Sequence, residues 1–384
     1  MYNKPLIFHF LGVKMRSALL MVPLLFVFVL AACQEEVPTE KASLQSVEIK
    51  DVMKFDENSA ETGDPEVFLS TPYQTATDDE GRIYIQDVPL GKFFVFNEAG
   101  EYQDVFGGRG RGPGEFENIR EIAMLDNSRF LVYDYMSRRA TVFNKELDVE
   151  KILDMEYNNS VSDISDFTEG ELLLSNFREG HLLQVYSLEE EQITDQIIPI
   201  KEVLSKEDES EERFLETTGG YVIKITEKLI AFTPEYYSGQ MYLYEKSDDQ
   251  WSQASIIKGY EDVQKPFSIH ETMNEPHERA MLISINPNGG YLGYEYHSYS
   301  QGLYKLEGNR FAHISFRDAD PEKTELRFIY EIFDAETGQL EKAAEIDSLR
   351  ADYPPETIPV HVDEKGFLYV ADITGSVRKI EVLW

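Results

Sequence analysis

The sequence predicts an all-β protein, a β-propeller of six blades with four antiparallel strands in each blade. One observation is a pattern of short strands and turns that is clearest from Thr77 to Phe116 and recurs toward the C-terminus. A second is its spacing: the equivalent turns at Gly81 and Ser128 are 47 residues apart, which is about the length of one propeller blade. A third is that no long apolar helix pattern competes with the strands.

The clearest unit shows why such strands must stack on neighbours. Residues 78–81 (DDEG) form a turn, because Asp can bond its own backbone and Gly tolerates a positive φ. Residues 82–86 (RIYIQ) alternate polar and apolar side chains, as a half-buried strand does. Strands at 92–96 and 101–106 follow after two further turns. Together with the strand before Asp78 they make a four-stranded unit, which cannot bury both faces without similar units beside it.

The later units repeat this order with weaker similarity. In blade two, residues 122–125 and 129–134 restate the first two strands, and residues 138–144 restate residues 92–97. The other strands are predicted at 161–167, 171–176, 181–188 and 192–200 in blade three; at 220–225, 228–233, 239–246 and 251–258 in blade four; at 281–286, 291–296, 301–306 and 310–316 in blade five; and at 358–362, 367–372 and 376–383 in blade six. A hairpin at 326–346 is left over, which leaves seven blades as an alternative.

Three segments do not follow this repeat of strands and turns. Residues 201–218 (KEVLSKEDESEERFLETT) are acidic and compatible with a helix, so we expect a short solvated helix inserted between blades three and four. Residues 259–278 form a second long link. Residues 44–55 (LQSVEIKDVMKF) are predicted to be a strand that completes the last blade and closes the ring, because blade six otherwise lacks its outer strand.

The N-terminal residues 1–32 are predicted to be a signal peptide. A basic segment at 14–16 precedes an apolar run at 18–30 that is short for a membrane span. Residues 30–33 (LAAC) resemble the lipobox of bacterial lipoproteins, which implies cleavage before Cys33, lipidation of its thiol and acylation of the new amino group, with palmitate as an expected acyl chain. The alternative is an anchor helix with an incidental cysteine. Residues 33–43 would then form a polar tether, and residues 44–384 the propeller domain.

Composition excludes some classes of function. The formal net charge is −35, with 36 Lys and Arg against 71 Asp and Glu. We therefore expect no nucleic-acid partner, because phosphates are bound by basic faces. Cys33 is the only cysteine, which excludes an internal disulfide, and a lipidated Cys33 could not serve as a nucleophile. The packed core must then supply the stability.

Several segments resemble a known family. The segments DEGRIYIQD, DNSRFLVYD and DEKGFLYVAD are similar to the blade motif of NHL-type and TolB-like six-bladed propellers. The run GGRGRGPGEF resembles the link between blades in the six-bladed propeller lipoproteins of Bacteroidetes. The resemblance implies a location in the cell envelope, with a lipid anchor at Cys33 in the outer membrane and the domain facing either the periplasm or the cell surface.

The candidate ligand-binding residues are those expected at the mouth of the central channel, where the innermost strands begin. They are Tyr73, Arg120, Asp163, Arg279 and His361. A metal-dependent propeller enzyme would need His, Asp or Glu to converge there. The seven histidines show no metal-ligand spacing, and neither GxSxG nor HExxH occurs. We therefore predict no metal site, with Ca²⁺ bound by oxygens of residues 78–80 as the alternative to a solvated turn.

The glycine-rich link at 107–114 has two interpretations. It lacks the GxGxxG and GxxxxGK patterns of phosphate loops, so a tight connection with Phe116 packed beneath it is the favoured one. The other is an anion site at Arg109 and Arg111, since cations are scarce in this acidic chain. Asp87, Asp134 and Asp372 end equivalent strands, and we expect them to cap turns rather than to bind a metal.

These observations favour a non-enzymatic scaffold that binds a ligand or an envelope protein at one face of the propeller. One alternative is a divalent-metal-dependent hydrolase or lyase that resembles gluconolactonase-type propellers. Another is a carbohydrate-binding component of an uptake system, since 22 Tyr and 23 Phe could offer stacking faces. Propeller architecture alone decides none of these, because one fold carries many functions.

Overall fold

The computed structural model describes residues 43–59, 68–155, 161–204, 209–273, 280–285, 291–319, 325–349, 351–352, 355–372 and 374–384. The predicted signal peptide, Cys33 and all of the predicted tether except Ser43 lie outside the described residues. Lys41–Trp384 form one compact unit. Within the described ranges, no helix has the length and apolar character needed to cross a membrane.

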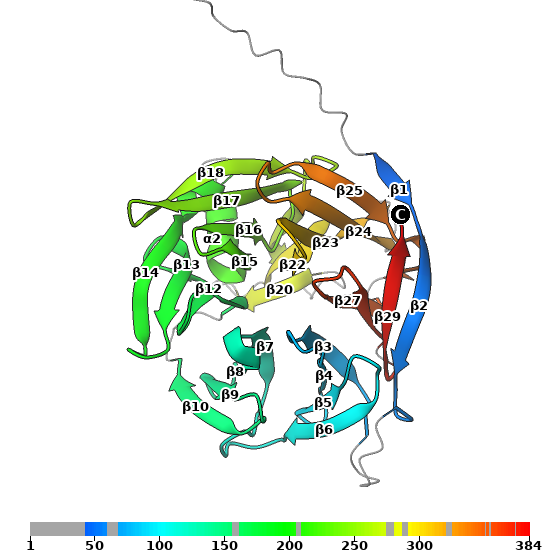
Figure 1. Cartoon of the computed structure of the whole chain (residues 1–384). Coiled ribbons are helices and arrows are strands. Elements are labelled where there is room, and N and C mark those ends of the chain that lie inside the picture. The colour runs from blue at the N-terminus through cyan, green and yellow to red at the C-terminus, as the bar shows by residue number, and fades with distance from the viewer. Residues whose placement is uncertain are drawn as a thin grey trace, which may run out of the picture. The chain divides into compact units, whose positions relative to one another are not determined.

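Six four-stranded antiparallel blades form a ring, as predicted (Figure 1). Blade one contains β3 (Pro72–Thr77), β4 (Ile83–Asp87), β5 (Lys92–Phe96) and β6 (Tyr102–Gly107); blade two contains β7 (Ile119–Met124), β8 (Phe130–Asp134), β9 (Arg139–Phe143) and β10 (Val149–Asp154). Blade three contains β11 (Asp163–Asp166), β12 (Glu171–Arg178), β13 (His181–Ser187) and β14 (Gln192–Pro199); blade four contains β15 (Gly220–Thr226), β16 (Leu229–Pro234), β17 (Gln240–Ser247) and β18 (Gln250–Lys258).

The last two blades each take up a strand from the N-terminal segment. Blade five contains β22 (Ser298–Leu306), β23 (Arg310–Asp318), β24 (Glu325–Asp334) and β25 (Leu340–Glu345); blade six contains β27 (Thr357–Val362), β28 (Leu368–Asp372) and β29 (Ser376–Leu383). β2 (Glu48–Phe55) pairs antiparallel with β29 and closes the ring, which confirms the predicted closure. β1 (Leu44–Ser46) pairs in parallel with β25 of blade five, and β26 (Ala351–Asp352) adds to β24 of the same sheet.

The prediction assigned the wrong strands to blade five. β19 (Phe267–Met273), β20 (Ala280–Ile285) and β21 (Tyr291–Tyr296) form a separate three-stranded sheet, called here the inserted sheet. The hairpin at 326–346, which the prediction left outside the blades, supplies β24 and β25 of blade five. Hairpins are encoded by local sequence, whereas the sheet that a hairpin joins depends on distant contacts.

The acidic insertion between blades three and four is helical but not wholly solvated. It contains α1 (Ile200–Val203) and α2 (Glu209–Thr218), besides the short 3-10 turns η1 (Asp126–Ser128) and η2 (Asp347–Leu349) elsewhere. Phe214 and Leu215 of α2 are fully buried. Helix periodicity places these two side chains on a face that packs inward, and Glu211 of the same helix is also buried, where it accepts from Tyr236 Oη at 2.6 Å. The expectation of a solvated helix is therefore corrected.

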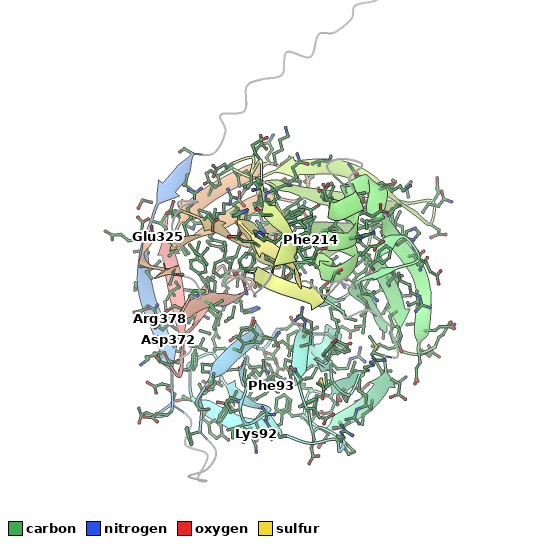
Figure 2. All side chains as sticks on the ribbon, turned by 180° about the vertical axis from the view of Figure 1, so that it is seen from behind. Lys92, Phe93, Phe214, Glu325, Asp372 and Arg378 are labelled. Carbon is green, nitrogen blue, oxygen red and sulfur yellow. The ribbon has the colours of Figure 1, made fainter. Side chains whose placement is uncertain are left out.

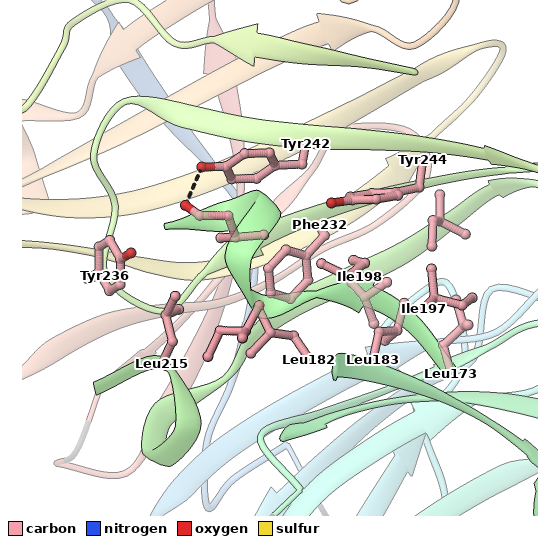
Figure 3. Packing of buried hydrophobic residues seen from close by; sticks show 14 of the residues in the cluster. Leu173, Leu182, Leu183, Ile197, Ile198, Leu215, Phe232, Tyr236, Tyr242 and Tyr244 are labelled. Atoms are coloured by element: carbon pink, nitrogen blue, oxygen red, sulfur yellow. Dashed lines mark hydrogen bonds between the residues drawn. The ribbon is translucent and has the colours of Figure 1, made fainter. Parts of the chain in front are cut away.

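The core consists of side chains packed between neighbouring blades. The five residues of β4 are all buried, because a second strand is covered on both faces by adjacent blades. Figure 2 shows the side chains throughout the ring, with Phe93 among those between the first two blades; its ring contacts Phe130 edge to face at 5.0 Å. Figure 3 shows the corresponding packing of blades three and four around α2, where Tyr242 Oη donates to Val203 O at 2.9 Å.

Candidate functional site

The axis of the ring is lined by the first strand of each blade. In order around the ring, β3 contacts β7, β7 contacts β11, β11 contacts β15, β15 contacts β22, β22 contacts β27, and β27 returns to β3. Side chains on these strands that point toward the axis face strands from other blades rather than their own sheet. Residues far apart in sequence can therefore meet there, which makes the axis the natural position for a binding site.

Irregular pairing directs side chains at the start of two of these strands. In β7 the register shifts between Ile119 and Glu121, so Arg120 has no direct partner on β8. In β3 the register shifts between Pro72 and Thr75. Such bulges re-aim side chains, and Gln74 Nε2 then donates to Arg120 O at 2.8 Å, which links the two bulged segments.

Seven ionisable side chains at the axis interact with one another, and we call them the axial cluster. Its members are Tyr73, Arg120, Glu121, Asp163, Tyr221, Glu235 and Tyr296. Glu121 interacts electrostatically with Asp163, Arg120 and Glu235. The cluster thus combines groups from blades one to four with one phenol from the inserted sheet.

Solvent reaches part of the axial cluster. Tyr73 is 46% exposed, and the side chain of Arg120 is 50% exposed, whereas that of Glu121 is 17% exposed. Tyr296 is buried. The cluster therefore has an accessible part at Tyr73 and Arg120 and a more enclosed part at the carboxyl groups, as expected of a site that receives a small molecule.

The surroundings of the carboxyl groups favour their protonated forms. Burial raises the pKa of Asp163 to about 7, against the opposing hydrogen bond that its Oδ2 accepts from Val222 N at 2.7 Å. Burial also raises the pKa of Glu235 to about 7, while the charge of Arg120 and the neighbouring phenol of Tyr296 act in the opposite direction. Burial and the neighbouring Asp163 hold the pKa of Glu121 well above its usual range. Near neutral pH these groups can both donate and accept hydrogen bonds.

Three of the five predicted channel-mouth residues, Tyr73, Arg120 and Asp163, belong to the axial cluster. His361 lies on β27, where its Nε2 is 2.9 Å from Thr77 Oγ1; burial lowers the pKa of His361 to about 4. Its ring packs edge to face on Tyr304 at 5.6 Å, and Tyr304 interacts electrostatically with Asp163 and Glu121. Arg279 lies outside the described residues.

Sequence reasoning missed four members of the cluster: Glu121, Tyr221, Glu235 and Tyr296. Glu121 follows Arg120 directly, so it could have been found by allowing for a bulge in the innermost strand. Tyr221 is the second residue of β15, in a position comparable to that of Arg120 in β7. Glu235 follows β16, and Tyr296 belongs to the inserted sheet, so neither position follows from the blade repeat.

The other candidate residues also have partners in the structure. Arg109 Nε donates to Pro89 O at 2.7 Å, and Arg111 Nε lies 2.9 Å from Glu117 Oε1. Phe116 is 2% exposed beneath the glycine-rich link. A depression of about 520 Å³ lies at the outer side of blade three, along β14, and shares no residue with the axial cluster.

The strand-end aspartates cap backbone N–H groups. Asp87 accepts hydrogen bonds from Ser70 N at 2.6 Å and Thr71 N at 3.0 Å, and Asp134 does the same for Glu117 N and Asn118 N at 2.6 and 3.2 Å. Asp372 accepts from Thr374 N at 2.8 Å. Across the described ranges, no three or more His, Cys, Asp or Glu residues come together in a way that could hold a metal ion.

The fold and the axial site together define a six-bladed β-propeller with an ionisable cluster at its axis. The chain belongs to the DUF5128 family, described as 6-bladed beta-propeller, whose model matches residues 42–258. No curated protein matches the chain in sequence.

Solved structures share the fold at low sequence identity. A member of the DUF4221 family from Bacteroides vulgatus has 9% identity and a TM-score of 0.52, over 89% of this chain and 99% of that chain. A protein of Bacteroides fragilis described as a candidate exported protein has 10% identity and a TM-score of 0.52, over 90% and 98% of the two chains. Virginiamycin B lyase from Staphylococcus aureus has 10% identity and a TM-score of 0.44, over 88% and 100%, which is too distant to bear on function.

Proposed function

We propose that the chain is an envelope-anchored propeller scaffold that binds a small polar ligand at the axial cluster. The observation that carries this proposal is the convergence of Arg120, three carboxyl groups and three phenols at the axis, with Tyr73 and Arg120 accessible to solvent. Such a group of side chains destabilises the folded chain, because several partly buried carboxyl groups lie close to one another. A ligand that forms hydrogen bonds with them would offset that cost.

A polyhydroxylated ligand, a saccharide, suits this chemistry best. Carboxyl groups with a pKa near 7 can donate to or accept from sugar hydroxyls, and Arg120 adds fixed donors. The exposed ring of Tyr73 offers an apolar face to the C–H groups of a sugar. These features favour the carbohydrate-binding alternative over a metal-dependent hydrolase or lyase, for which the described residues offer no ligand set.

The anchor part of the proposal rests on residues 30–33 (LAAC). We infer that Cys33 carries the lipid and that the outer membrane is the membrane partner. Growth of the bacterium with an alkyne-bearing palmitate analogue should label the wild-type chain, and Cys33→Ala should abolish both the label and recovery with membranes. A Cys33→Ala chain that still carries the label would contradict lipidation at this residue.

The binding part can be tested by a thermal-unfolding screen of the full chain against glucose, galactose, mannose, maltose and cellobiose, each up to about 100-fold above an expected millimolar Kd. At that excess a ligand that binds only the folded state raises stability by about 2.7 kcal/mol. We expect a concentration-dependent rise in Tm with at least one sugar. The same sugar should have no effect on Tyr73→Ala. A rise that Tyr73→Ala retains would place the sugar elsewhere.

A further inference from the structure

The inserted sheet has one apolar face and one polar face. On β19, Phe267 and Ile269 pack toward the hydrophobic cluster around Phe214, as do Tyr294 and Tyr296 of β21. Successive side chains of a strand point to opposite faces, so Ser268 lies on the face turned away from that cluster. This polar face carries a group of side chains that the axial site does not use.

Ser268, His297 and Asp318 form a connected chain of hydrogen bonds. Ser268 Oγ is 2.7 Å from His297 Nε2, and His297 Nδ1 is 2.9 Å from Asp318 Oδ2. The backbone holds the three segments together, since His297 N donates to Pro266 O at 2.8 Å and Asp318 N donates to His297 O at 2.9 Å.

The carboxylate of Asp318 determines which ring nitrogen of His297 carries the hydrogen. A carboxylate only accepts, so Nδ1 of His297 must carry the hydrogen that Asp318 receives. Nε2 of a neutral His297 then has the lone pair that accepts the Ser268 hydroxyl hydrogen. A serine next to a base that is itself oriented by an acid is the arrangement that activates a nucleophile.

The protein contains an internal comparison for this arrangement. Ser300 Oγ lies 3.0 Å from His313 Nε2, and His313 Nδ1 lies 3.1 Å from Glu331 Oε2. All three of these residues are 0% exposed, and Glu331 also accepts from Tyr237 Oη at 3.0 Å. That second group is closed to any substrate and serves as a buried polar network.

The Ser268 group differs because it is accessible. Ser268 is partly exposed, and the side chain of His297 is 21% exposed, whereas that of Asp318 is 6% exposed. A partly exposed serine, a partly exposed base and a buried acid suit nucleophilic catalysis, because the substrate must reach only the serine and the base.

We propose that Ser268 is a nucleophile for small activated carboxylic esters, with His297 as its base and Asp318 as the positioning residue. Ser268 Oγ would form a bond to the acyl carbon, its proton would pass to His297 Nε2, and the alcohol would leave with that proton. Water would then cleave the acyl-serine by the same transfers, releasing the acid and restoring Ser268. The N–H groups of His297 and Ser298, next to the proposed base, both donate to Pro266 O and are not available to an oxyanion. The substrate class proposed is therefore esters with good leaving groups, such as aryl esters, whose cleavage depends least on oxyanion stabilisation. This proposal goes beyond ligand binding at the axis and does not depend on it.

The experiment is labelling of the folded full chain with a fluorophosphonate, followed by peptide mass spectrometry. Attack by Ser268 Oγ displaces fluoride from phosphorus, so the adduct marks the nucleophile in the wild-type chain without any substitution. We expect the adduct on Ser268 and none on Ser300, and we expect it to vanish when the chain is first unfolded in urea. Absence of a Ser268 adduct from the folded chain, or equal labelling after unfolding, would overturn the proposal.

Hydrolysis of p-nitrophenyl acetate gives the second readout. General-base assistance contributes about 100-fold or more, so His297→Ala should slow the labelling of Ser268 by at least about 100-fold, and Ser268→Ala should remove the hydrolysis that exceeds buffer. Ser247→Ala, at an exposed serine at the end of β17, is the matched control and should leave both rates unchanged. Labelling of Ser268 that His297→Ala does not slow would show an ordinary exposed hydroxyl instead of an activated one.

Discussion

Single aspartates at the ends of second strands hold the links between blades in place. Asp134, the last residue of β8, is 1% exposed and accepts from the backbone N–H groups of Glu117, Asn118, Met136 and Ser137. The carboxylate of Asp134 thus accepts from the link before β7 and from the turn after β8. Asp87 accepts from the link before blade one in the same way.

We predict that Asp134→Ala lowers the free energy of unfolding by about 2–4 kcal/mol, because it removes a buried carboxylate that accepts four backbone hydrogen bonds. Hydrogen bonds to charged groups contribute about 1.5–3 kcal/mol. Urea denaturation followed by tryptophan fluorescence measures the change. Asp154→Ala, at an exposed aspartate that ends β10, is the control and should change stability by less than about 0.5 kcal/mol. Equal effects of the two substitutions would contradict the capping role.

The axial carboxyl groups give stability a characteristic dependence on pH. Burial raises the pKa of Glu235 from 4.5 to about 7, so the folded state holds this proton more tightly than the unfolded state does. The contribution of Glu235 to stability is therefore present below about pH 4.5 and is lost as the pH rises through 7. His361, whose pKa burial lowers to about 4, acts in the opposite direction, since its contribution is present above pH 6.5 and is lost as the pH falls toward 4.

We predict that Glu235→Gln stabilises the chain more at pH 8 than at pH 5, with a difference on the order of 2 kcal/mol after allowance for partial exposure. Glutamine keeps the size and hydrogen bonds of a protonated glutamate but never becomes charged. Comparing variant with wild type at each pH cancels the contributions of His361 and other groups. A stability difference that stays constant from pH 5 to pH 8 would refute the raised pKa.

At the level of elements, α2 connects the inserted sheet to the ring. Phe214 stacks on Tyr294 of β21 at 4.5 Å with the ring planes 14° apart, and on Tyr236, which follows β16, at 5.7 Å and 15°. Phe267 of β19 contacts the same ring at 4.4 Å. Figure 2 shows Phe214 within the wall of the ring, so one side chain joins the helix, the inserted sheet and blade four.

We predict that Phe214→Ala loosens the inserted sheet while the blades stay folded. Loss of a buried phenylalanine costs about 3–5 kcal/mol, and Phe214 contacts rings on both β19 and β21 of this sheet. Hydrogen exchange read by mass spectrometry should show faster exchange in peptides covering β19 and β21, with blades one and two unchanged. Arg213→Ala, at the exposed neighbouring residue, should leave exchange as in the wild type. Uniformly faster exchange in all blades would mean that Phe214 supports the whole ring.

The same elements mark how far the sequence could predict the structure. Alternation and turn residues are local signals, so the strands of blades one and six and the first three strands of blade two were assigned close to their observed positions. The fourth strand of blade two, β10, was not predicted. The strands at 281–286 and 291–296 were also correct, but the prediction assigned them to blade five, because nothing local distinguishes an inserted hairpin from a blade hairpin. Phe214 was predicted to lie on a solvated helix, since the acidic residues around it outweighed two apolar ones in the pattern.

For the whole molecule, the way the propeller ring closes explains why only part of the axial cluster was predictable. Knowing that first strands line the axis was enough to place Tyr73, Arg120 and Asp163 there. The same rule could not identify Glu235, which follows a second strand, or Tyr296, which comes from the inserted sheet. Their positions depend on how blade four and the insertion pack around α2, and that packing is specified by contacts among residues distant in sequence.

A saccharide site at the axis can be tested by calorimetric titration of the full chain with the sugar that stabilises it most, in wild type and in Arg120→Ala. Arg138→Ala, at an exposed arginine in the turn after β8, is the matched control for loss of a positive charge. We expect saturable one-site binding to the wild type and unchanged binding to Arg138→Ala. Binding to Arg120→Ala should be at least about tenfold weaker, which corresponds to one charge-assisted hydrogen bond of about 1.4 kcal/mol. Binding that is equally strong in Arg120→Ala, or no saturable binding by the wild type to any sugar tested, would contradict a saccharide site at the axis of the propeller.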